Sequence, residues 1–468
     1  MSLKALLFLA TYFGGLGLAF VYPIIGLMTY LWAFYQYPQN RWWGEEVPEL
    51  RWSLIAGLVT LIATIFSVNM TSRQPVSIGR HDHHSAPIWN AGFIILALFT
   101  TWMWIQSPWA ADPEAHQVGC LLFTKYVVLF GLFQYVLDGR RSLEWFFFAN
   151  VIGATVWGIT MWQSDAGQAR IELILGPGVE DANTGSLHLA ACAGFAGMLL
   201  IGWDSRLRWV ALAALPFILN GVILTGSRGG LLGLFAAGII AVFLGPRHKK
   251  SIVVACAVLG AVLFFQLASE TFWDRMATLR PGEEETLETS AASRLVVNRG
   301  NWNMFLDHPF GVGHRGDIVI SPQYMPGWVL NSGIGLRAAH NTMLAVLSNH
   351  GVPGIVLFGA LHVWAAITLL RLKRLDRLGL PTSLGAMRAS IGAGITAYVI
   401  CGLFSNYIKA EVAIWCFALI PLLQRECMRW KHDTQDRTST AVRDPVRPAV
   451  PVGTPGNPKR LLAPHNGS

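Results

Sequence analysis

One group of residues able to do chemistry is the run from Thr225 to Gly230, which reads TGSRGG and joins two apolar segments. The guanidinium of Arg228 offers a fixed fork of donors that suits phosphate. The glycines beside it allow a sharp turn and a close approach of the backbone to a ligand. The alternative is a simple turn whose arginine extends its charged end to lipid headgroups. Spacing alone leaves both interpretations open.

Two more groups follow along the chain. Ser293-Arg294 precedes the run PFGVG at residues 309–313, and Ala339-His340-Asn341 precedes GVPG at residues 351–354. The imidazole of His340 takes up a proton near neutral pH, so it is a candidate general base. The alternative is a histidine that only caps a helix or binds a backbone carbonyl.

The elements that must position these residues are mostly apolar. The 468 residues are 53% hydrophobic and only 13% charged, and the charges lie almost entirely between long apolar segments. Such segments cross a bilayer as helices, because a helix satisfies its own backbone hydrogen bonds. The pattern predicts an all-α polytopic membrane bundle of about 12 transmembrane helices. The predicted segments are residues 4–20, 22–37, 52–68, 88–105, 119–137, 144–162, 187–203, 208–225, 229–244, 251–268, 342–370, 389–406 and 409–424.

The first two segments are short and are separated only by Tyr22-Pro23. They form either a tight hairpin or one broken crossing, so the prediction is 12–13 crossings and the side of the N-terminus stays open. Lysine and arginine gather in alternate connections, which the positive-inside rule assigns to the cytoplasm. This explains the net charge of +8 without nucleic acid as a partner. The basic connections are Arg140-Arg141, Arg206 with Arg208, residues 247–250, residues 371–388 and the tail from Arg425.

Two regions are predicted to lie outside the membrane, and residues 1–431 otherwise form the membrane domain. Residues 269–341 form one long, partly structured loop on the side opposite the basic connections, which is the periplasmic side in a bacterium. Residues 432–468 are polar and without periodicity, which indicates a disordered cytoplasmic tail. The six cysteines have no metal-ligand spacing, and we expect no disulfides, metal or cofactor.

The three groups, taken in order, resemble the O-antigen ligase family of bacterial inner-membrane glycosyltransferases. The resemblance covers about residues 178–354, which we take as the core. It includes Asp181-Ala182-Asn183, similar to an acidic-x-Asn element that precedes a helix in that family. Tyr37-Pro38 and the run RWWG at residues 41–44 resemble the exosortase-associated O-glycosylation ligase branch.

The resemblance implies transfer of a glycan from a polyprenyl diphosphate carrier to an acceptor hydroxyl on a lipid, protein or polysaccharide, without metal or nucleotide sugar. Arg228 and Arg294 would bind the diphosphate, and His340 would activate the acceptor. A departure is Asn349, which stands where family members often carry a glutamate. Further residues for the same site are Arg299, Arg315, Arg337, Asp181, Asn183 and Asn341.

Two alternatives remain beside a ligase in the bacterial inner membrane that acts at the periplasmic face. A polysaccharide polymerase of the same fold would join repeat units instead of attaching a finished glycan. A transporter or flippase would carry charged residues near the centres of several helices. The apolar segments here are nearly free of charge, with Lys125 as one exception, so the sequence favours an enzyme.

Overall fold

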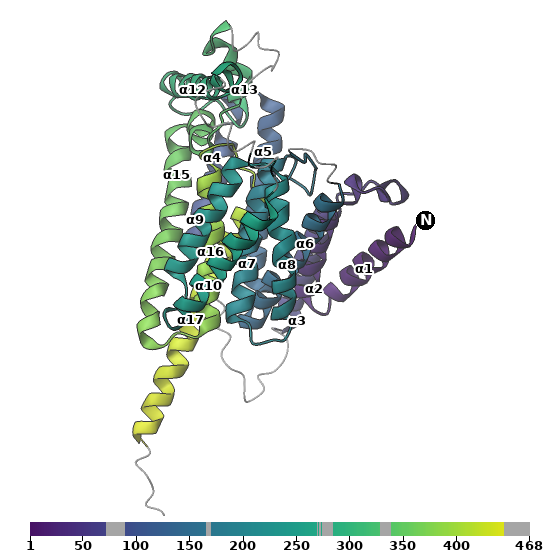
Figure 1. Ribbon diagram of the computed structural model, residues 1–468, viewed down its shortest axis with the longest axis vertical. Helices are drawn as coiled ribbons and strands as arrows, with labels where there is room; N and C mark the ends of the chain where they lie inside the picture. The colour runs from purple at the N-terminus through teal and green to yellow at the C-terminus, as the bar shows by residue number, and fades with distance from the viewer. Residues whose placement is uncertain are drawn as a thin grey trace, which may run out of the picture. The chain divides into compact units, whose positions relative to one another are not determined.

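The computed structural model describes residues 1–71, 89–164, 170–268, 284–327 and 338–443, together with Glu270 and Trp273. These residues form helices and short turns, without a β-strand among them (Figure 1). Each of the thirteen predicted apolar segments is a helix. They are α1 (Leu3–Ala19), α2 (Pro23–Gln36), α3 (Trp52–Thr71), α4 (Ala91–Ile105), α5 (Pro113–Val136), α6 (Gly139–Gln163), α7 (Ala182–Gly202), α8 (Arg208–Leu224), α9 (Arg228–Leu244), α10 (Lys250–Leu267), α15 (Thr342–Lys373), α16 (Thr382–Cys401) and α17 (Glu411–Arg443).

The helices confirm a polytopic membrane protein. Among the described residues, seven stretches are long and apolar enough to cross a bilayer by length and composition: Ala91–Trp109, Pro113–Val136, Gly139–Gln163, Ala182–Gly202, Arg247–Gln266, Thr342–Leu378 and Thr382–Cys401. Four shorter apolar helices accompany them: Leu3–Ala19, Trp52–Ser67, Arg208–Leu224 and Arg228–Leu244. The figure of 12–13 crossings stays a prediction.

The first two predicted segments form a helical hairpin. Pro23 begins α2, where its missing N–H is not needed by the helix, and α1 packs against α2. Tyr12 of α1 donates a hydrogen bond of 2.7 Å from its hydroxyl to the carbonyl of Trp52, at the start of α3. At the end of α2, Arg41 donates to the carbonyls of Gln36 and Tyr35 at 2.8 and 3.2 Å. In this structure the arginine of the RWWG run therefore caps a helix.

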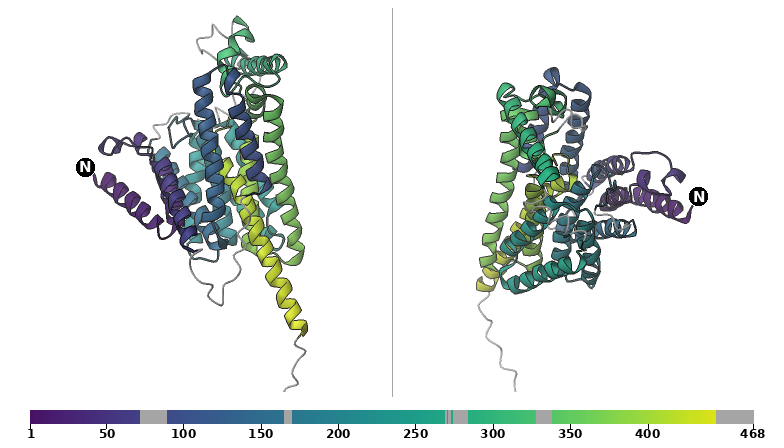
Figure 2. Two further views of the ribbon diagram at one scale, coloured as in Figure 1. Left: turned by 180° about the vertical axis from the view of Figure 1, so that it is seen from behind. Right: turned by 45° about the horizontal axis from the view of Figure 1, so that its top comes forward.

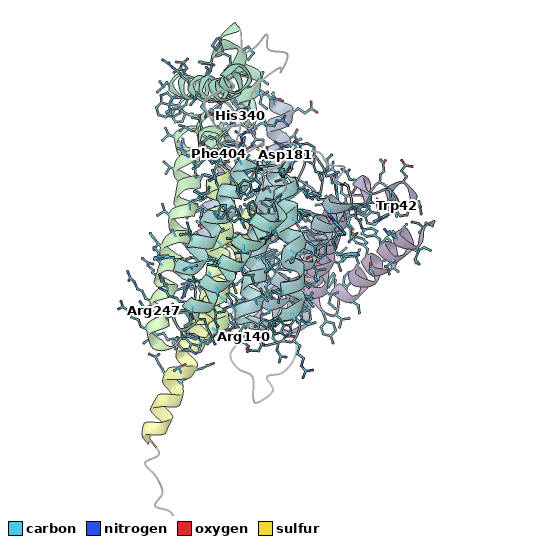
Figure 3. The ribbon with its side chains drawn as sticks, viewed as in Figure 1. Trp42, Arg140, Asp181, Arg247, His340 and Phe404 are labelled. Carbon is cyan, nitrogen blue, oxygen red and sulfur yellow. The ribbon has the colours of Figure 1, made fainter. Side chains whose placement is uncertain are left out.

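The two ends of the bundle differ in charge. Arg140 and Arg247 lie at one end, which we call the basic end (Figure 3). Asp181, His340 and Phe404 lie at the opposite end, which we call the site end. The basic connections predicted at residues 140–141 and 247–250 therefore share an end, and the groups chosen for their chemistry lie at the other.

Arg388 holds the basic end together. It was predicted to mark a connection, but α16 begins at Thr382 and buries its side chain completely. The guanidinium pairs with both carboxylate oxygens of Asp376, at 2.8 and 2.9 Å. It also donates to the carbonyls of Leu244 and Leu372 at 2.7 and 3.1 Å. These carbonyls end α9 and α15, so a cation lies at the negative ends of two helix dipoles.

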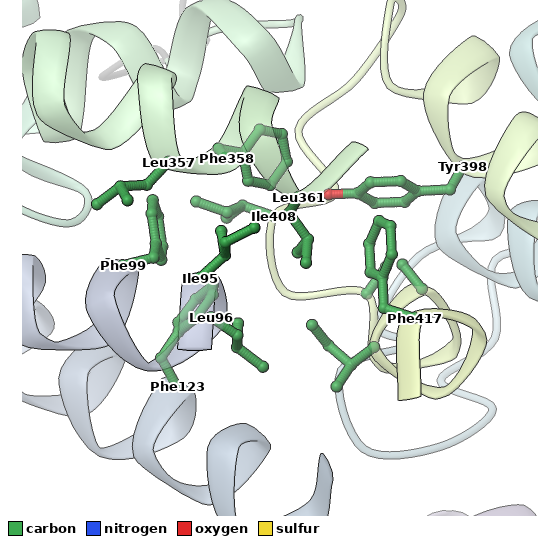
Figure 4. Close-up of a pocket in the computed structure, with 13 residues that line it drawn as sticks. Ile95, Leu96, Phe99, Phe123, Leu357, Phe358, Leu361, Tyr398, Ile408 and Phe417 are labelled. Carbon is green, nitrogen blue, oxygen red and sulfur yellow. The ribbon is translucent and has the colours of Figure 1, made fainter. Parts of the chain in front are cut away.

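The interior of the bundle is closely filled. The hydroxyl of Tyr35 in α2 donates to Asn150 of α6 and contacts His188 of α7, both at 2.8 Å, so a buried polar network joins three helices. Between α4, α5, α15, α16 and α17 lies a cavity of about 10 Å³, large enough for about one water. Figure 4 shows its wall of aliphatic and aromatic side chains, with the hydroxyl of Tyr398 directed inward.

The long loop is partly structured, as predicted. Its described part contains α12 (Glu284–Asp307), α13 (Gly316–Ile320) and the 3-10 turn η5 (Ser321–Gln323). Figures 1 and 2 show α12 and α13 at the site end of α15. Toward the C-terminus, the chain divides into units of residues 1–427 and 428–468. Helix α17 continues to Arg443, into the range predicted as a tail, and residues 444–468 lie outside the described part.

Candidate functional site

The segment from Gly402 to Ala410 joins α16 to α17 at the site end, and we call it the 402–410 loop. It binds the start of α15 through Thr342, whose N–H donates to the carbonyl of Gly402 at 2.7 Å. The Thr342 hydroxyl donates to the carbonyl of Ser405 at 2.8 Å and accepts from the N–H of Tyr407 at 2.9 Å. Three hydrogen bonds therefore hold the N-terminal end of α15, just after His340.

The start of α9 contacts the same loop. Arg228 is its first residue and is half-buried, and the preceding Ser227 caps the helix by accepting from the N–H of Gly230 at 3.2 Å. Gly226 has a φ of 55°, which explains the sharp turn expected here. A Cβ on Gly229 would lie 3.3 Å from Phe404 of the loop.

The glycines after Arg228 have a packing role in addition to the turn that was predicted. A Cβ on Gly230 would clash with the hydroxyl of Ser186 in α7. The carbonyl of Gly229 accepts from the thiol of Cys401 at 3.3 Å. The absence of side chains lets α9 approach α7 and the end of α16, and this contact sets the position of the Arg228 backbone.

The start of α7 is the third helix end at this loop. Asp181 caps it by accepting from the N–H of Thr184 at 2.8 Å, and Asn183 lies half-buried in the first turn. Just before the cap, a Cβ on Gly178 would lie 3.8 Å from the carbonyl of Lys409 in the loop. The cap gives Asp181 a structural reason to be acidic.

The three helices therefore begin against one loop. The N-terminus of a helix carries a partial positive charge from its unpaired N–H groups, and it favours bound anions. Here the ends of α9 and α15 accompany the guanidinium of Arg228, and the end of α7 is already capped by the carboxylate of Asp181. The site end is suited to a strongly negative group such as a diphosphate.

His340 is half-buried and lies one residue before the cap of α15. That cap is Asn341, whose side-chain oxygen accepts from the N–H of Leu344 at 3.1 Å. On its other side, the N–H of Ala339 donates to Asp317 at 3.2 Å. The backbone is therefore held immediately before and after the histidine, which limits where its imidazole can lie.

Asp317 connects this backbone to α15. Its own N–H donates to the side-chain oxygen of Asn349 at 3.0 Å, and the Asn349 amide donates to the carbonyl of Ala345 at 2.9 Å. Only 1% of Asp317 is exposed, and this burial raises the pKa of its carboxyl above the ordinary value. The spacing of Asp317 in the sequence gives no signal of this role.

The run at residues 309–313 docks on α15 rather than forming part of the phosphate site. At Gly351, φ is 64° and the helix is broken. The loop backbone supplies the missing partners: the N–H groups of Val312 and Gly313 donate to the carbonyls of Ser348 and Asn349 at 3.2 and 2.9 Å. The N–H of Val352 donates to the carbonyl of Pro309 at 2.8 Å. The predicted glycines thus serve a tight contact between the long loop and the helix.

The structure describes some of the other predicted site residues and not others. Arg294 lies in α12, but its side chain is outside the described residues. Arg299 in α12 is exposed, and so is Arg315, which precedes α13 with a φ of 63°. Arg337 lies outside the described residues. The structure brings the helices of Arg228 and His340 to one loop and leaves the contribution of Arg294 as a prediction.

A cation that sequence reasoning missed is Arg170. The N–H of the next residue, Ile171, donates to the carbonyl of Leu224 at the end of α8 at 2.9 Å, so Arg170 lies near the turn that carries Arg228. It pairs with Glu172 at 2.5 Å. Residue type could have indicated it, because Arg170, like Arg228, is an arginine in a segment poor in basic residues.

The described residues contain no group of three or more His, Cys, Asp or Glu side chains that could hold a metal ion. The six cysteines are free. The described groups at the site end include the guanidinium of Arg228, the starts of three helices and the imidazole of His340.

Known proteins resemble this chain over the part that contains the starts of α9 and α15. Residues 211–359 match the family described as O-antigen ligase, a range that includes Arg228, Arg294 and His340 but not Asp181. The chain is 32% identical over 160 residues to the O-antigen ligase of Pseudomonas aeruginosa, which is 33% of this chain and 34% of that protein. It is 28% identical over 165 residues to the teichuronic acid biosynthesis protein TuaE of Bacillus subtilis, or 33% of this chain and 32% of that protein. Each match spans about a third of the relative.

Proposed function

We propose that the protein is an O-antigen ligase-like glycosyltransferase, which transfers a glycan from a polyprenyl diphosphate carrier to an acceptor hydroxyl. It acts in the bacterial cytoplasmic membrane, with the site end on the periplasmic face. The observation that carries the proposal is that α9 with Arg228 and α15 with His340 begin against one loop, opposite the basic end. The similarity of residues 211–359 to O-antigen ligases supports the same activity.

In the proposed reaction, His340 accepts the proton of the acceptor hydroxyl while the hydroxyl oxygen attacks C1 of the donor sugar. The bond between C1 and the diphosphate oxygen breaks, and its electron pair leaves with the polyprenyl diphosphate. Attack from the side opposite the leaving group inverts the configuration at C1. The proton on His340 then passes to solvent, which restores the base.

The role of Arg228 follows from the charge of the leaving group. Negative charge grows on the diphosphate as the bond breaks, so a guanidinium placed there stabilises the transition state more than the bound substrate. Arg294 is proposed to make a second such contact. The N-termini of α9 and α15 would add to the same positive field. Neither a metal ion nor a cofactor takes part in the proposed steps.

The test is glycan transfer in membranes that contain each variant and a lipid-linked donor. We expect His340→Ala to lower the rate by about 10²–10⁴-fold, which is the usual contribution of a general base. Arg228→Ala and Arg294→Ala should each lower it by about 10²–10³-fold, and Arg228→Lys should restore only part of the rate because lysine lacks the planar fork. Exposed residues give matched controls, His308→Ala and Arg141→Ala, which should transfer normally.

Two results would count against the proposal. Normal transfer by His340→Ala at unchanged expression would show that His340 is not the general base. Wild-type rates in both Arg228→Ala and Arg294→Ala would show that these arginines do not bind the diphosphate.

A polymerase of the same fold is the second candidate, because one relative is named for teichuronic acid biosynthesis rather than for ligation. Disruption of the gene, followed by analysis of surface polysaccharide and glycoproteins, separates the two. Unattached glycan of normal chain length indicates a ligase. Products limited to a single repeat unit indicate a polymerase.

A further inference from the structure

Three cations gather at the basic end, where the turn between α9 and α10 meets the end of α15. Arg247 lies in that turn, at the basic end of the bundle (Figure 3), and Lys250 begins α10. From α15, Lys373 places its ammonium 3.2 Å from the centre of the Phe243 ring on α9. Arg247 and Lys250 are both near enough to act electrostatically on that ammonium. We call Arg247, Lys250 and Lys373 the basic-end cluster.

The basic-end cluster lacks an anionic partner within the described part of the chain. None of its three cations forms an ion pair with a described carboxylate. The carboxylate of Asp376 also acts on Lys373, but both of its oxygens already accept from Arg388. Like charges held close together repel each other, so the cluster favours an anion from outside the protein.

The turn that carries Arg247 is fixed to α16. The imidazole of His248 makes a hydrogen bond of 2.7 Å with the hydroxyl of Thr382, at the start of α16. A Cβ on Gly385 would lie 3.0 Å from Pro246, so the turn and the helix are in close contact. The backbone beside the cluster is therefore held in place, and an anion would meet cations that are already gathered.

An apolar groove of about 380 Å³ begins beside the cluster and lies between α7, α8, α9, α10 and α16. Pro246, which directly precedes Arg247, is part of its wall, and so is Val253 in the first turn of α10. Among the described residues that line the groove, none is charged. Ser390 is on the wall, but its hydroxyl already donates to the carbonyl of Gly194 at 2.7 Å. The wall is suited to hydrocarbon.

The groove has about the depth of one leaflet. Along α10 its wall extends from Val253 to Phe264, and eleven residues of helix span about 16 Å. The hydrocarbon core of a bilayer is about 30 Å thick, so each leaflet contributes about 15 Å. On α9 the wall extends from Leu234 to Val242 and does not include the first turn, where Arg228 lies. The groove therefore belongs to the leaflet at the basic end.

We propose that the basic end binds an anionic phospholipid of the adjacent leaflet, with its phosphate at the basic-end cluster and one acyl chain in the groove. The charge of the cluster recognises the headgroup, and the depth of the groove fits a chain that ends within the same leaflet. Basic pockets between transmembrane helices bind anionic headgroups in this way. The lipid would fill the space between α10 and the rest of the bundle. This inference does not rest on the proposed transfer reaction.

The acyl-chain part is tested with a photoreactive phosphatidylglycerol that carries its reactive group at the end of one chain. The full-length protein in phosphatidylcholine vesicles should be labelled on α9 and α10, and unlabelled phosphatidylglycerol should compete at least tenfold better than added phosphatidylcholine. Gly238 and Gly260 line the groove, and a Cβ on either meets no atom within 4 Å. We expect Gly238→Leu and Gly260→Leu each to lower labelling at least tenfold. Gly359→Leu is the matched control, since a Cβ there also meets nothing and Gly359 does not line the groove.

The headgroup part is tested by charge reversal at Lys250. Glutamate is favourable in the first turn of a helix, and Arg247 and Lys249 keep the turn basic, so α10 should fold and insert normally in Lys250→Glu. We expect labelling by the phosphatidylglycerol probe to fall about tenfold. Added phosphatidylglycerol should raise the Tm of wild type in detergent by mass action and should raise that of Lys250→Glu much less. Arg141→Glu, which changes an exposed cation in the first turn of α6, should behave as wild type.

Three results would overturn the inference. Equal competition by phosphatidylcholine would mean that the groove accepts any membrane lipid. Stronger competition by a polyprenyl phosphate than by phosphatidylglycerol would mean that the groove holds a different lipid. Equal labelling of wild type and Gly238→Leu would mean that the labelled lipid lies outside the groove. All three are measured without glycan transfer, so failure of this inference is distinct from failure of the proposed function.

Discussion

His340 depends on the chain that precedes it. Ala339 is held by a buried carboxylate, Asp317, and Asp317 is held in turn by Asn349 of α15. None of these residues needs to touch a substrate to affect the reaction, because each determines where the imidazole lies. We therefore regard Asp317 as a positioning residue for His340.

Asp317 can be tested by two substitutions. Asp317→Ala leaves the buried N–H of Ala339 without a partner, which costs about 1–3 kcal/mol, and we expect it to lower kcat for transfer at least tenfold. Asp317→Asn keeps an acceptor oxygen and removes a charge from a buried place, so it should retain most of the activity. The measurement is kcat and KM for each variant beside Asp307→Ala, an exposed acidic control. Equal loss in the alanine and asparagine variants would mean that the charge itself is required.

Individual residues of the candidate site could be predicted from the sequence in some cases and not in others. Arg228 and His340 were selected because of residue type and place along the chain, and the structure puts their helices against one loop. Asp317 and Asn349 were not paired, because their contact joins positions that are distant in sequence and depends on how the long loop folds back. Arg388 was assigned to a connection since arginine is rare inside apolar helices, and only the packing of α9 and α15 around it explains its burial.

The break in α15 is the feature that joins the long loop to the bundle. A broken helix leaves carbonyls without intrahelical partners. Here the backbone of residues 309–313, the side chain of Trp102 in α4 and the side chain of Gln106, the C-cap of α4, satisfy them. Trp102 donates to the carbonyl of His350 at 2.7 Å, and Gln106 donates to that of Asn349 at 3.1 Å. Helix and loop therefore determine each other's position.

Gly351→Ala should disturb that contact. The new Cβ would clash with the carbonyl of Pro309, and a residue with a side chain at a φ of 64° is strained by roughly 1–2 kcal/mol. We expect residues 309–313 to undock, with faster proteolysis of the loop and at least a tenfold loss of transfer. Gly359→Ala is the control on the same helix, where there is room for a methyl group and alanine favours the helix. Unchanged proteolysis in Gly351→Ala would show that docking of residues 309–313 does not require glycine at the break in α15.

Sequence was most informative about the helices, since length and hydrophobicity are local properties of a segment. All thirteen apolar segments were identified as such. It was least informative about helix ends, and α7 and α16 each begin several residues before the predicted segments. The polar residues near these helix starts, including Asp181 and Arg388, are paired within the protein, so their polarity did not mark the end of the helix.

Across the whole molecule, stability at the basic end depends on Arg388. Arg388→Ala would leave Asp376 buried without its partner and the carbonyls that end α9 and α15 unsatisfied. Loss of one member of a buried ion pair costs about 3–5 kcal/mol, so we expect a clearly lower Tm in detergent. Arg388→Lys should recover part of it, since lysine keeps the charge without the bidentate geometry. The exposed Arg377→Ala is the control, and a Tm equal to wild type in Arg388→Ala would contradict this role.

Docking of the long loop on the bundle should depend on pH through His314. This histidine lies in the turn before α13, its N–H donates to His116 at 2.8 Å, and its ring stacks 5.8 Å from that of His350. Burial lowers the pKa of His314 to about 3, and the nearby Lys409, His116 and Arg315 act in the same direction. The docked loop therefore keeps His314 neutral at pH values where the undocked loop would bind a proton.

The direction of the pH effect on docking follows from the different pKa of His314 in the docked and the undocked loop. An undocked histidine takes up its proton near pH 6.5, so docking weakens as pH falls from there toward 3, by at most about 1.4 kcal/mol per pH unit. The raised pKa of Asp317 acts in the opposite sense, because the docked loop holds that proton more tightly. We expect proteolysis of the loop to quicken between pH 6.5 and 5 in wild type and to change less in His314→Gln. Parallel pH profiles for the two proteins would exclude His314 as the cause.

The break at Gly351 also bears on how the chain is made. Residues 309–313 precede α15 in the chain, so they leave the ribosome first, and in the proposed orientation they cross the membrane before that helix is inserted. A spanning helix normally completes its own hydrogen bonds as it enters lipid, but α15 also uses the backbone amides of Val312 and Gly313 from the preceding loop. We therefore expect the hydrogen bonds of α15 to be completed only after residues 309–313 have folded, so that biogenesis proceeds from this loop to the helix that follows it.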